Sequence, residues 1–532
     1  MIPHFGEQNT TCWGLAEEKN VLQSFSPRNG IIVYSTSLTW CEENCGSFTP
    51  PVTTDFLFVF MGFALPAVIF STVIPRRWRL DLSEQTFKLS RRQIFSILKL
   101  FFSIPAVCVV ATFDMMGWII CIMTFAGPMV FSGVQEMLLD FRGVSFLKGS
   151  EGFSAREKLE VAVALLCGNF DQDPDDPTSR IHNALIPPVL TEESLESSKS
   201  RLITIMNAQT SFGMTIGTPT VFFLAGFLYT ATQASSTGAS TGAIAFGILW
   251  MVLVVVTIVS GTLLAGNSPH TVSVLVTNNN IRGRQTRRFL CRDMYDSELY
   301  PVSMWDRGFN KYQWLKNSAL WQDPRGTFRR RMELRGWSWA AIAIGTHLLL
   351  ATPCLLAWSF DYLIPWPWFG CLSLLYLIYL ITQTLLILVA LALANLDVPF
   401  HTVWRPWELV PKGSSQSIIL SSALFLLTFF AGVASFGAAS FTIFGSIYQF
   451  TDRFDTCFCS MPVSSWMLPA AQQWVFVNIK FTSLDYESWI DNLNFFLPVG
   501  AAIFTGIVCF LGWWYQRALR VALKDVITDI EH

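Results

Sequence analysis

The amino-acid sequence predicts an all-α fold: a polytopic α-helical membrane bundle with about nine transmembrane helices, an exoplasmic N-terminus and a cytoplasmic C-terminus. Of the 532 residues, 52% are hydrophobic and 14% are charged, whereas soluble domains carry about a quarter charged residues. Long apolar runs, each able to cross a hydrocarbon core about 30 Å thick, account for the difference. Lysine and arginine collect in alternate connecting segments, the pattern that sets orientation in membranes.

Nine apolar segments are expected to span the bilayer and to divide the chain into four groups of helices. Helices 1–3 (56–133) are expected at 56–74, 96–113 and 115–133; helices 4–5 (208–266) at 208–231 and 243–266; helices 6–8 (337–441) at 337–358, 364–394 and 417–441; and helix 9 at 494–515. The second and third form a tight hairpin with Asp114 at its outer turn, or a re-entrant pair that does not fully cross.

The distribution of basic residues predicts the orientation. With the N-terminus outside, the external segments hold only four of the 36 basic residues, namely Lys19, Arg28, Arg453 and Lys480. Inverting the chain would place the other 32 outside, against the positive-inside rule. Residues 1–30 lack a basic start followed by an apolar core, so the first span is expected to direct insertion. We expect a multi-pass protein of the secretory pathway, resident in the plasma membrane.

Two segments are expected on the exoplasmic side, 1–55 and 442–493. The first contains the sequon "NTT", which makes Asn9 a glycosylation acceptor. The two segments hold the disulfide candidates Cys12, Cys41, Cys45, Cys457 and Cys459. An oxidising compartment favours disulfides there, but their pairing cannot be read from sequence. No metal site is expected, because "WCEENC" has only His4 near it.

The segments 134–207 and 267–336 and the tail 516–532 are expected in the cytoplasm. In the first, "SAREKLEVAVALLCG" (154–168) predicts an amphipathic helix with a Ser154–Glu157 capping box, lying against the bilayer or the spans. The arginines of 281–292 and 325–336 either bind anionic lipid headgroups or serve orientation alone. The net charge of −2 excludes a nucleic-acid partner of the usual basic kind.

The acidic stretch "FDQDPDDP" (170–177) raises the question of a magnesium–diphosphate enzyme. Asp171 and Asp175 are four residues apart, a spacing that puts two carboxylates on one face of a helix. Pro174 lies between them and opposes a helix at this point. We therefore expect a solvated loop, and Mg²⁺ enters only under the alternative of a catalytic pair. No other cofactor is expected.

Three features within the spans are candidates for helix packing or for lining a cavity. Gly213 and Gly217 form a G-x-x-x-G motif that permits close helix approach. Pro219 follows and frees a carbonyl that Ser211, Thr215 or water would satisfy. His347 lies near the middle of the sixth expected span and Gln383 lies in the seventh, where polar groups are costly and often functional. The alternative for both residues is a purely structural role, in which the side chain forms a hydrogen bond to a neighbouring helix.

The middle of the chain, roughly 205–315, resembles a group of multi-pass membrane proteins of filamentous fungi. The resemblance rests on "QTSFGMTIGTPTVFFLAGF", "AFGILWMVLVVVTIVSGTLLAGNSPHTV" and "YPVSMWDRGFNKYQWL". It implies a fungal source and an association with small-molecule biosynthesis or surface functions, and it transfers no catalytic residue.

Three functions follow as hypotheses. The first is a non-enzymatic protein that binds or transports a lipophilic small molecule through a kinked bundle, as an accessory to fungal secondary-metabolite biosynthesis. The second is a membrane-embedded enzyme acting on prenyl or polyketide intermediates, a terpene cyclase or prenyltransferase, with Asp171 and Asp175 as ligands of Mg²⁺. The third is a cell-surface sensing protein that uses its exoplasmic segments as a receptor.

Overall fold

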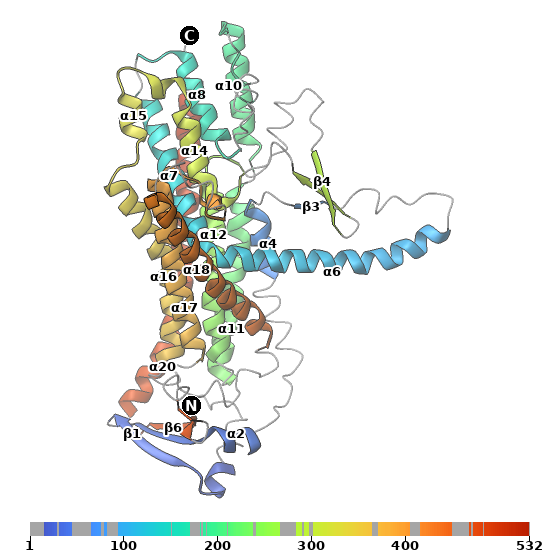
Figure 1. Ribbon diagram of the computed structural model, residues 1–532, viewed down its shortest axis with the longest axis vertical. Helices are drawn as coiled ribbons and strands as arrows, with labels where there is room; N and C mark the ends of the chain where they lie inside the picture. Colours follow the sequence, from blue (N-terminus) through green and yellow to red (C-terminus); the bar gives the residue numbers. More distant parts are fainter. Residues whose placement is uncertain are drawn as a thin grey trace.

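The computed structural model is mostly helical (Figure 1). It describes residues 15–28, 31–44, 65–75, 79–81, 94–149, 152–170, 181, 185–187, 189–209, 211–237, 241–266, 284–289, 292–296, 302–363, 371–404, 415–448, 468–469, 472–481 and 484–530.

Five of the described helices are long and apolar enough to cross a membrane. They are α12 (Thr241–Thr262), α16 (Trp337–Leu363), α17 (Cys371–Asn395), α18 (Ser415–Tyr448) and α20 (Leu484–Thr528). The bent pair α6 (Ile94–Thr124) and α7 (Ala126–Lys148) makes a sixth if it counts as one span. The chain is thus a multi-pass helical membrane protein by the described helices, while the predicted count of nine is not shown.

Helix α12 is the centre of the bundle. It packs against α16, α20 and α7, and 94% of its apolar stretch Ile244–Thr262 is buried. A helix enclosed on all sides must be apolar on all sides, which explains its unbroken run of aliphatic residues. The other four long helices bury one side and expose apolar side chains on the other, as Ile344, Phe430 and Phe510 do. That exposure is expected where the solvent is lipid.

The predicted hairpin with its turn at Asp114 is wrong. Helix α6 runs without interruption through Asp114 to Thr124, and the chain bends by 71° before α7 begins at Ala126. A single aspartate does not end a helix. Pro128 lies in the first turn of α7, and in a continuous helix its ring would crowd the carbonyl of Thr124, four residues earlier, which favours a bend at this point. Figure 1 shows α6 leaving the bundle sideways while α7 runs along it.

A group of shorter helices covers the C-terminal end of the bundle (Figure 1). This cap consists of α8 (Ala155–Cys167), α10 (Glu192–Asn207), η3 (Met304–Asp306), α14 (Arg307–Lys316), η4 (Ala319–Gln322), α15 (Thr327–Met332) and the ends of α7 and α20. The predicted capping box of α8 is confirmed, since Ser154 N–H donates to Glu157 Oε2 over 2.8 Å. Helix α8 is enclosed by the cap, because every residue from Leu159 to Cys167 is buried.

Two small antiparallel sheets were not predicted from the sequence. One orders its strands β1 (Gln23–Arg28), β2 (Ile31–Ser37) and β6 (Trp474–Phe481), with Val33 opposite Ile479. Helix α2 (Leu38–Asn44) follows directly after strand β2. The other orders β3 (Arg79–Asp81), β5 (Arg292–Asp296) and β4 (Arg284–Phe289). The first sheet joins the two segments that were expected on the exoplasmic side, and the second joins two that were expected in the cytoplasm.

Candidate functional site

The bend between α6 and α7 leaves backbone groups without helical partners, and Gln383 of α17 binds them. The N–H of Gly127 donates to Gln383 Oε1 over 2.7 Å. Gln383 Nε2 donates to the carbonyls of Thr124 at 3.1 Å and Met123 at 3.2 Å. One amide side chain therefore replaces the hydrogen bonds that a continuous helix would have made. We call this arrangement the helix break.

Two more side chains complete the helix break. Ser435 of α18 accepts a hydrogen bond from Gln383 Nε2 over 2.7 Å and donates to the Thr124 carbonyl over 2.9 Å. Tyr379 of α17 donates its hydroxyl to the Met123 carbonyl over 2.7 Å. Gln383, Ser435 and Tyr379 are all almost completely buried. Because an unsatisfied backbone group in a bilayer costs several kcal/mol, these contacts make the bend a fixed part of the fold.

Four aromatic side chains surround the helix break. The ring of Phe125, the residue between α6 and α7, meets Trp305, Trp404 and Phe400 edge to face at centroid distances of 5.8, 6.1 and 6.3 Å. Trp305 belongs to η3 in the cap, and Phe400 and Trp404 belong to η5 (Phe400–Trp404) after α17. Trp404 is 41% exposed, so this aromatic group reaches the molecular surface.

The part of α6 that leads to the helix break is open to its surroundings. Val109 is 53% exposed and Phe113 is 71% exposed. No described atom lies within 4 Å of a Cβ placed on Gly117. This part of α6 therefore presents apolar side chains at the side of the bundle before the chain reaches the helix break.

The G-x-x-x-G segment has an unusual backbone but not the expected packing. Residues Gly213–Gly217 form one turn of π-helix, η2, directly before α11 (Thr218–Thr237). Thr218 Oγ1 donates to the Gly213 carbonyl over 3.0 Å. A Cβ on either glycine would meet, among the described residues, only atoms of this same segment, at 3.8 Å. Neither glycine is thus a point of close approach between the described helices, and a role in packing or in lining a cavity stays a prediction for both.

Close approach occurs instead at two glycines on the other side of η2. A Cβ on Gly261 of α12 would overlap the side chain of Ile216 in the π-turn. A Cβ on Gly512 of α20 would lie 2.8 Å from Thr262 Cγ2 and 3.0 Å from Ile258 Cγ2. The close packing at small residues in this region is therefore made by Gly261 of α12 and Gly512 of α20.

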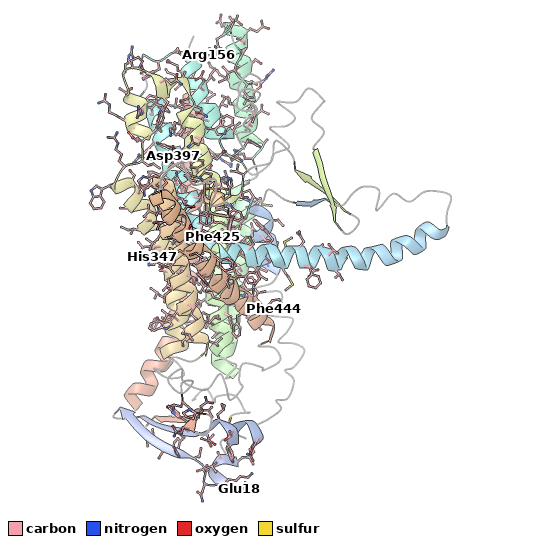
Figure 2. All side chains as sticks on the ribbon, in the orientation of Figure 1. Glu18, Arg156, His347, Asp397, Phe425 and Phe444 are labelled. Carbon is pink, nitrogen blue, oxygen red and sulfur yellow. The ribbon has the colours of Figure 1, made fainter. Side chains whose placement is uncertain are left out.

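His347 lies in the middle of the bundle, between Glu18 at one end of the molecule and Arg156 in the cap (Figure 2). Its Nδ1 is 3.4 Å from Thr384 Oγ1 of α17, and the side chain is half-buried. This contact between α16 and α17 corresponds to the purely structural role, a hydrogen bond to a neighbouring helix.

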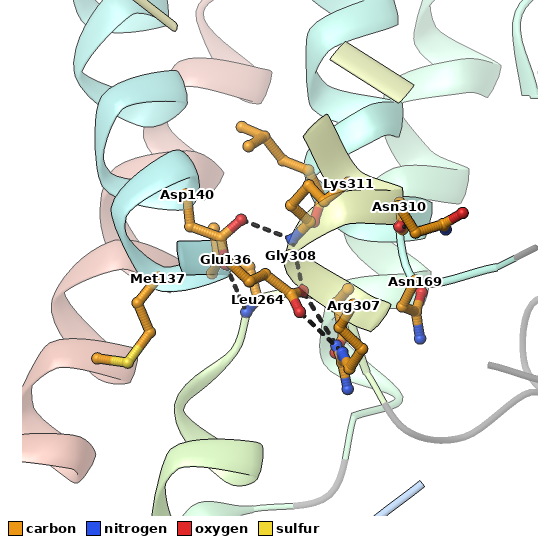
Figure 3. Close-up of polar contacts among 12 residues, drawn as sticks. Glu136, Met137, Asp140, Asn169, Leu264, Arg307, Gly308, Asn310 and Lys311 are labelled. Atoms are coloured by element: carbon orange, nitrogen blue, oxygen red, sulfur yellow. Dashed lines mark hydrogen bonds and ion pairs between the residues drawn. The ribbon is translucent and has the colours of Figure 1, made fainter. Parts of the chain in front are cut away.

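A buried group of four charged side chains joins the cap to the bundle (Figure 3). Glu136 and Asp140 are four residues apart on α7, and Arg307 and Lys311 are four apart on α14. Arg307 holds Glu136 with Nε–Oε2 at 2.8 Å and Nη2–Oε1 at 3.1 Å. Lys311 Nζ lies 2.9 Å from Glu136 Oε1 and 2.6 Å from Asp140 Oδ1. We call these four residues the ionic joint.

The remaining polar atoms of the ionic joint bind the ends of two other helices. Arg307 Nη2 donates to the carbonyl of Ala265, after α12, over 2.8 Å. Lys311 Nζ donates to the carbonyl of Leu165 in α8 over 2.9 Å. The N–H of Leu264 donates to Asp140 Oδ2 over 3.1 Å. Four elements thus meet at one point.

The ionic joint is suited to holding the fold together and not to catalysis. All four side chains are 0% exposed, and two acids against two bases leave no net charge. Each charged group has partners inside the protein, as buried ions require. No substrate can touch them in this arrangement. Nearby, burial raises the pKa of the Cys167 thiol to about 12, so this cysteine is no nucleophile near neutral pH.

Sequence reasoning missed the ionic joint although a signal was present. The stretches "EMLLD" (136–140) and "RGFNK" (307–311) each place two like charges four residues apart, with opposite signs. On helices, such pairs form matching faces. The third span is expected to end at 133, which places Glu136 and Asp140 in the cytoplasmic segment 134–207 and outside any expected helix. Helix α7 in fact continues to Lys148.

Several predicted sites fall on parts of the chain that are not described. These are Asp171, Asp175, Asn9, Cys12, Cys45, Cys457 and Cys459. Cys41 is described; it is buried and is not one of the free thiols. The disulfides and the glycan remain predictions. Within the described ranges, no three His, Cys, Asp or Glu side chains are placed to hold a metal ion.

Comparison of the chain with protein-family models, curated proteins and solved structures finds no match.

Proposed function

We propose that this membrane protein binds a lipophilic small molecule at the helix break, and that it carries or presents that molecule within the bilayer. The observation that carries the proposal is the bend of 71° between α6 and α7, whose backbone groups are bound by Gln383 and Ser435. Interrupted helices that are satisfied by their neighbours line the binding sites of many membrane carriers. The aromatic group beside the break offers flat apolar surface, and Trp404 is exposed.

The ligand class follows from the surroundings of the helix break. The aromatic rings of Phe125 and Trp404 favour an apolar or unsaturated ligand. The buried amide of Gln383 is hydrogen-bonded to the backbone of the bend and to Ser435. Its role is to hold the backbone in place, and it does not contribute to ligand recognition. Under the resemblance to fungal membrane proteins, isoprenoid or polyketide intermediates of secondary metabolism are the first compounds to try.

Photo-labelling of the reconstituted protein tests this proposal. The purified chain in phosphatidylcholine liposomes is irradiated with a diazirine analogue of farnesol, and labelled peptides are mapped by mass spectrometry. We expect labelling close to Phe125 and within residues 400–404 that is saturable and that excess farnesol suppresses. Trp404→Ala should reduce it several-fold. The matched control Trp337→Ala removes an exposed tryptophan that is not part of the aromatic group, and it should change nothing. Labelling that does not saturate, and that has the same extent in Trp404→Ala, Trp337→Ala and the unmodified protein, would refute the proposal.

The enzyme hypothesis has a separate test. If Asp171 and Asp175 held Mg²⁺, replacing both with Asn would abolish product formation in the producing strain. Our proposal expects an unchanged metabolite profile. A profile that loses one prenylated or cyclised product would favour the enzyme.

The orientation of the chain is part of the proposal. The N-terminus is exoplasmic and the C-terminus cytoplasmic in a protein of the plasma membrane. The basic residues support this direction. The pairing of β2 with β6 and of β3 with β5 supports the assignment of the paired segments to a common side. A glycan on Asn9 and a protease-accessible cytoplasmic tag after His532 test it. Finding both on one side of the membrane would overturn it.

A further inference from the structure

Five arginines form an exposed basic surface at the start of helix α16. Arg325, Arg329, Arg330, Arg331 and Arg335 are all exposed, and we call them the arginine surface. The stretch 325–336 contains one acidic residue, Glu333, against these five bases. It is therefore among the most basic parts of the described chain.

The fold of α15 forces these side chains outward. Phe328 and Met332, four residues apart on α15, are 0% exposed. Phe328 packs edge to face on Phe146 and Trp321, with ring centroids 4.9 and 6.3 Å away. Residues four apart share one face of a helix, so that face is turned inward. Arg329, Arg330 and Arg331 occupy the remaining faces.

The arginine surface is held in place next to a membrane span. Arg142 of α7 donates to the carbonyl of Arg331 over 3.3 Å, to that of Glu333 over 3.2 Å and to Ser338 Oγ over 2.5 Å. These bonds fix the end of α15 relative to the first turn of α16. Trp337, the first residue of α16, is 87% exposed. Exposed tryptophans at the ends of apolar helices lie at the headgroup level of a bilayer.

Among the described residues, most of these arginines have no acidic partner. Glu333 pairs with Arg335. Within the described part of the chain, no carboxylate lies within ion-pair distance of Arg325, Arg329, Arg330 or Arg331. Orientation of the chain requires only that positive charge be present. It does not require four exposed arginines within seven residues (325–331), none of them within reach of a described carboxylate, next to a helix whose first residue is an exposed tryptophan.

We infer that the arginine surface binds the phosphate groups of anionic phospholipids in the adjacent leaflet. A guanidinium group donates two parallel hydrogen bonds to a phosphate, and a cluster of basic residues beside a span is the arrangement that recognises acidic lipids. Binding there would anchor α15 at the membrane. The hydrogen bonds from Arg142 would connect this anchored segment to α7. The inference is independent of the ligand proposed for the helix break.

Lipid titration followed by native mass spectrometry tests the inference. The full-length protein in detergent is titrated with phosphatidylserine or phosphatidylcholine, and bound lipids are counted. The variant R329A/R330A removes two exposed charges. At about 1 kcal/mol per basic residue and 1.4 kcal/mol per tenfold change, its phosphatidylserine affinity should fall about 30-fold. The control K158A/K524A removes two lysines elsewhere in the cap and should change the affinity less than about threefold.

A second measurement makes the test independent of the variants. For the unmodified protein, raising the salt concentration should weaken phosphatidylserine binding and leave phosphatidylcholine binding unchanged, because salt screens exposed charges. Equal binding of the two lipids would overturn the inference. An equal loss in both double variants would also overturn it. Complete competition by inorganic phosphate at the lipid concentration would assign the surface to a soluble anion.

Discussion

Substitution of Arg307 by Met should loosen the cap from the bundle. Arg307 supplies two hydrogen bonds to Glu136 and one to the Ala265 carbonyl. Without it, Glu136 and Asp140 share the single positive charge of Lys311, and the ionic joint carries one net negative charge at 0% exposure. Leaving a charge of this kind buried costs about 3–5 kcal/mol.

Hydrogen–deuterium exchange of the protein in lipid nanodiscs measures this loss locally. The amide of Leu264 donates to Asp140, so its exchange reports opening of the joint. A loss of about 3–5 kcal/mol corresponds to exchange roughly 100- to 4,000-fold faster. The control Arg335→Met removes an arginine that is 72% exposed and paired with Glu333. A surface pair contributes at most about 1 kcal/mol, so the control should accelerate exchange less than about fivefold.

A compensating variant separates charge from packing. Glu136→Gln combined with Arg307→Met leaves Lys311 facing Asp140, which is a neutral pair. If the uncompensated charge is the cause, the double variant should exchange more slowly than Arg307→Met alone. The reasoning fails if Arg307→Met behaves like Arg335→Met, or if the double variant is no milder than the single one.

Three further predictions concern other parts of the fold. Gln383→Leu should lower the thermal stability strongly, because buried backbone groups at the helix break lose their partners at about 1–3 kcal/mol each; Leu388→Ala on the lipid-facing side of the same helix is the control, and equal shifts would count against the helix break. Gly261→Ala should destabilise the protein by overlap with Ile216, and adding Ile216→Ala should restore part of the stability, whereas an additive loss would contradict the contact. Since burial raises the pKa of Cys167 to about 12, its thiol should resist N-ethylmaleimide in the folded protein up to about pH 9 and react after denaturation; labelling that rises through neutral pH would contradict the burial.

Much of the membrane fold could be predicted from the sequence because bilayers impose simple rules. Apolar length located the described spans of α12, α16, α17 and α18, and the Ser154–Glu157 pair located the start of α8. The bend was misplaced because Asp114, the most polar residue of its stretch, was taken as the turn. Local backbone sterics at Pro128 favour the observed position instead.

The site depended on contacts between residues far apart in the sequence. Gln383 was noticed as a polar residue in a span, but its partners at Met123 and Thr124 are about 260 positions away. Nothing in a one-dimensional pattern pairs them. The strands β2 and β6 are even farther apart, with more than 430 positions between paired residues, which explains why this sheet was not predicted. Register between distant short strands is set by their surroundings and not by their own composition.

The central claim is that the bend between α6 and α7 is a fixed feature at which a lipophilic molecule binds. A cryo-electron microscopy structure in lipid nanodiscs with saturating farnesol tests it most directly. The account predicts that α6 and α7 meet at an angle, that Gln383 contacts the backbone of Thr124, and that ligand density lies against Phe125 and Trp404. A straight helix through Phe125, or an ordered ligand elsewhere with none at the aromatic group, would contradict it.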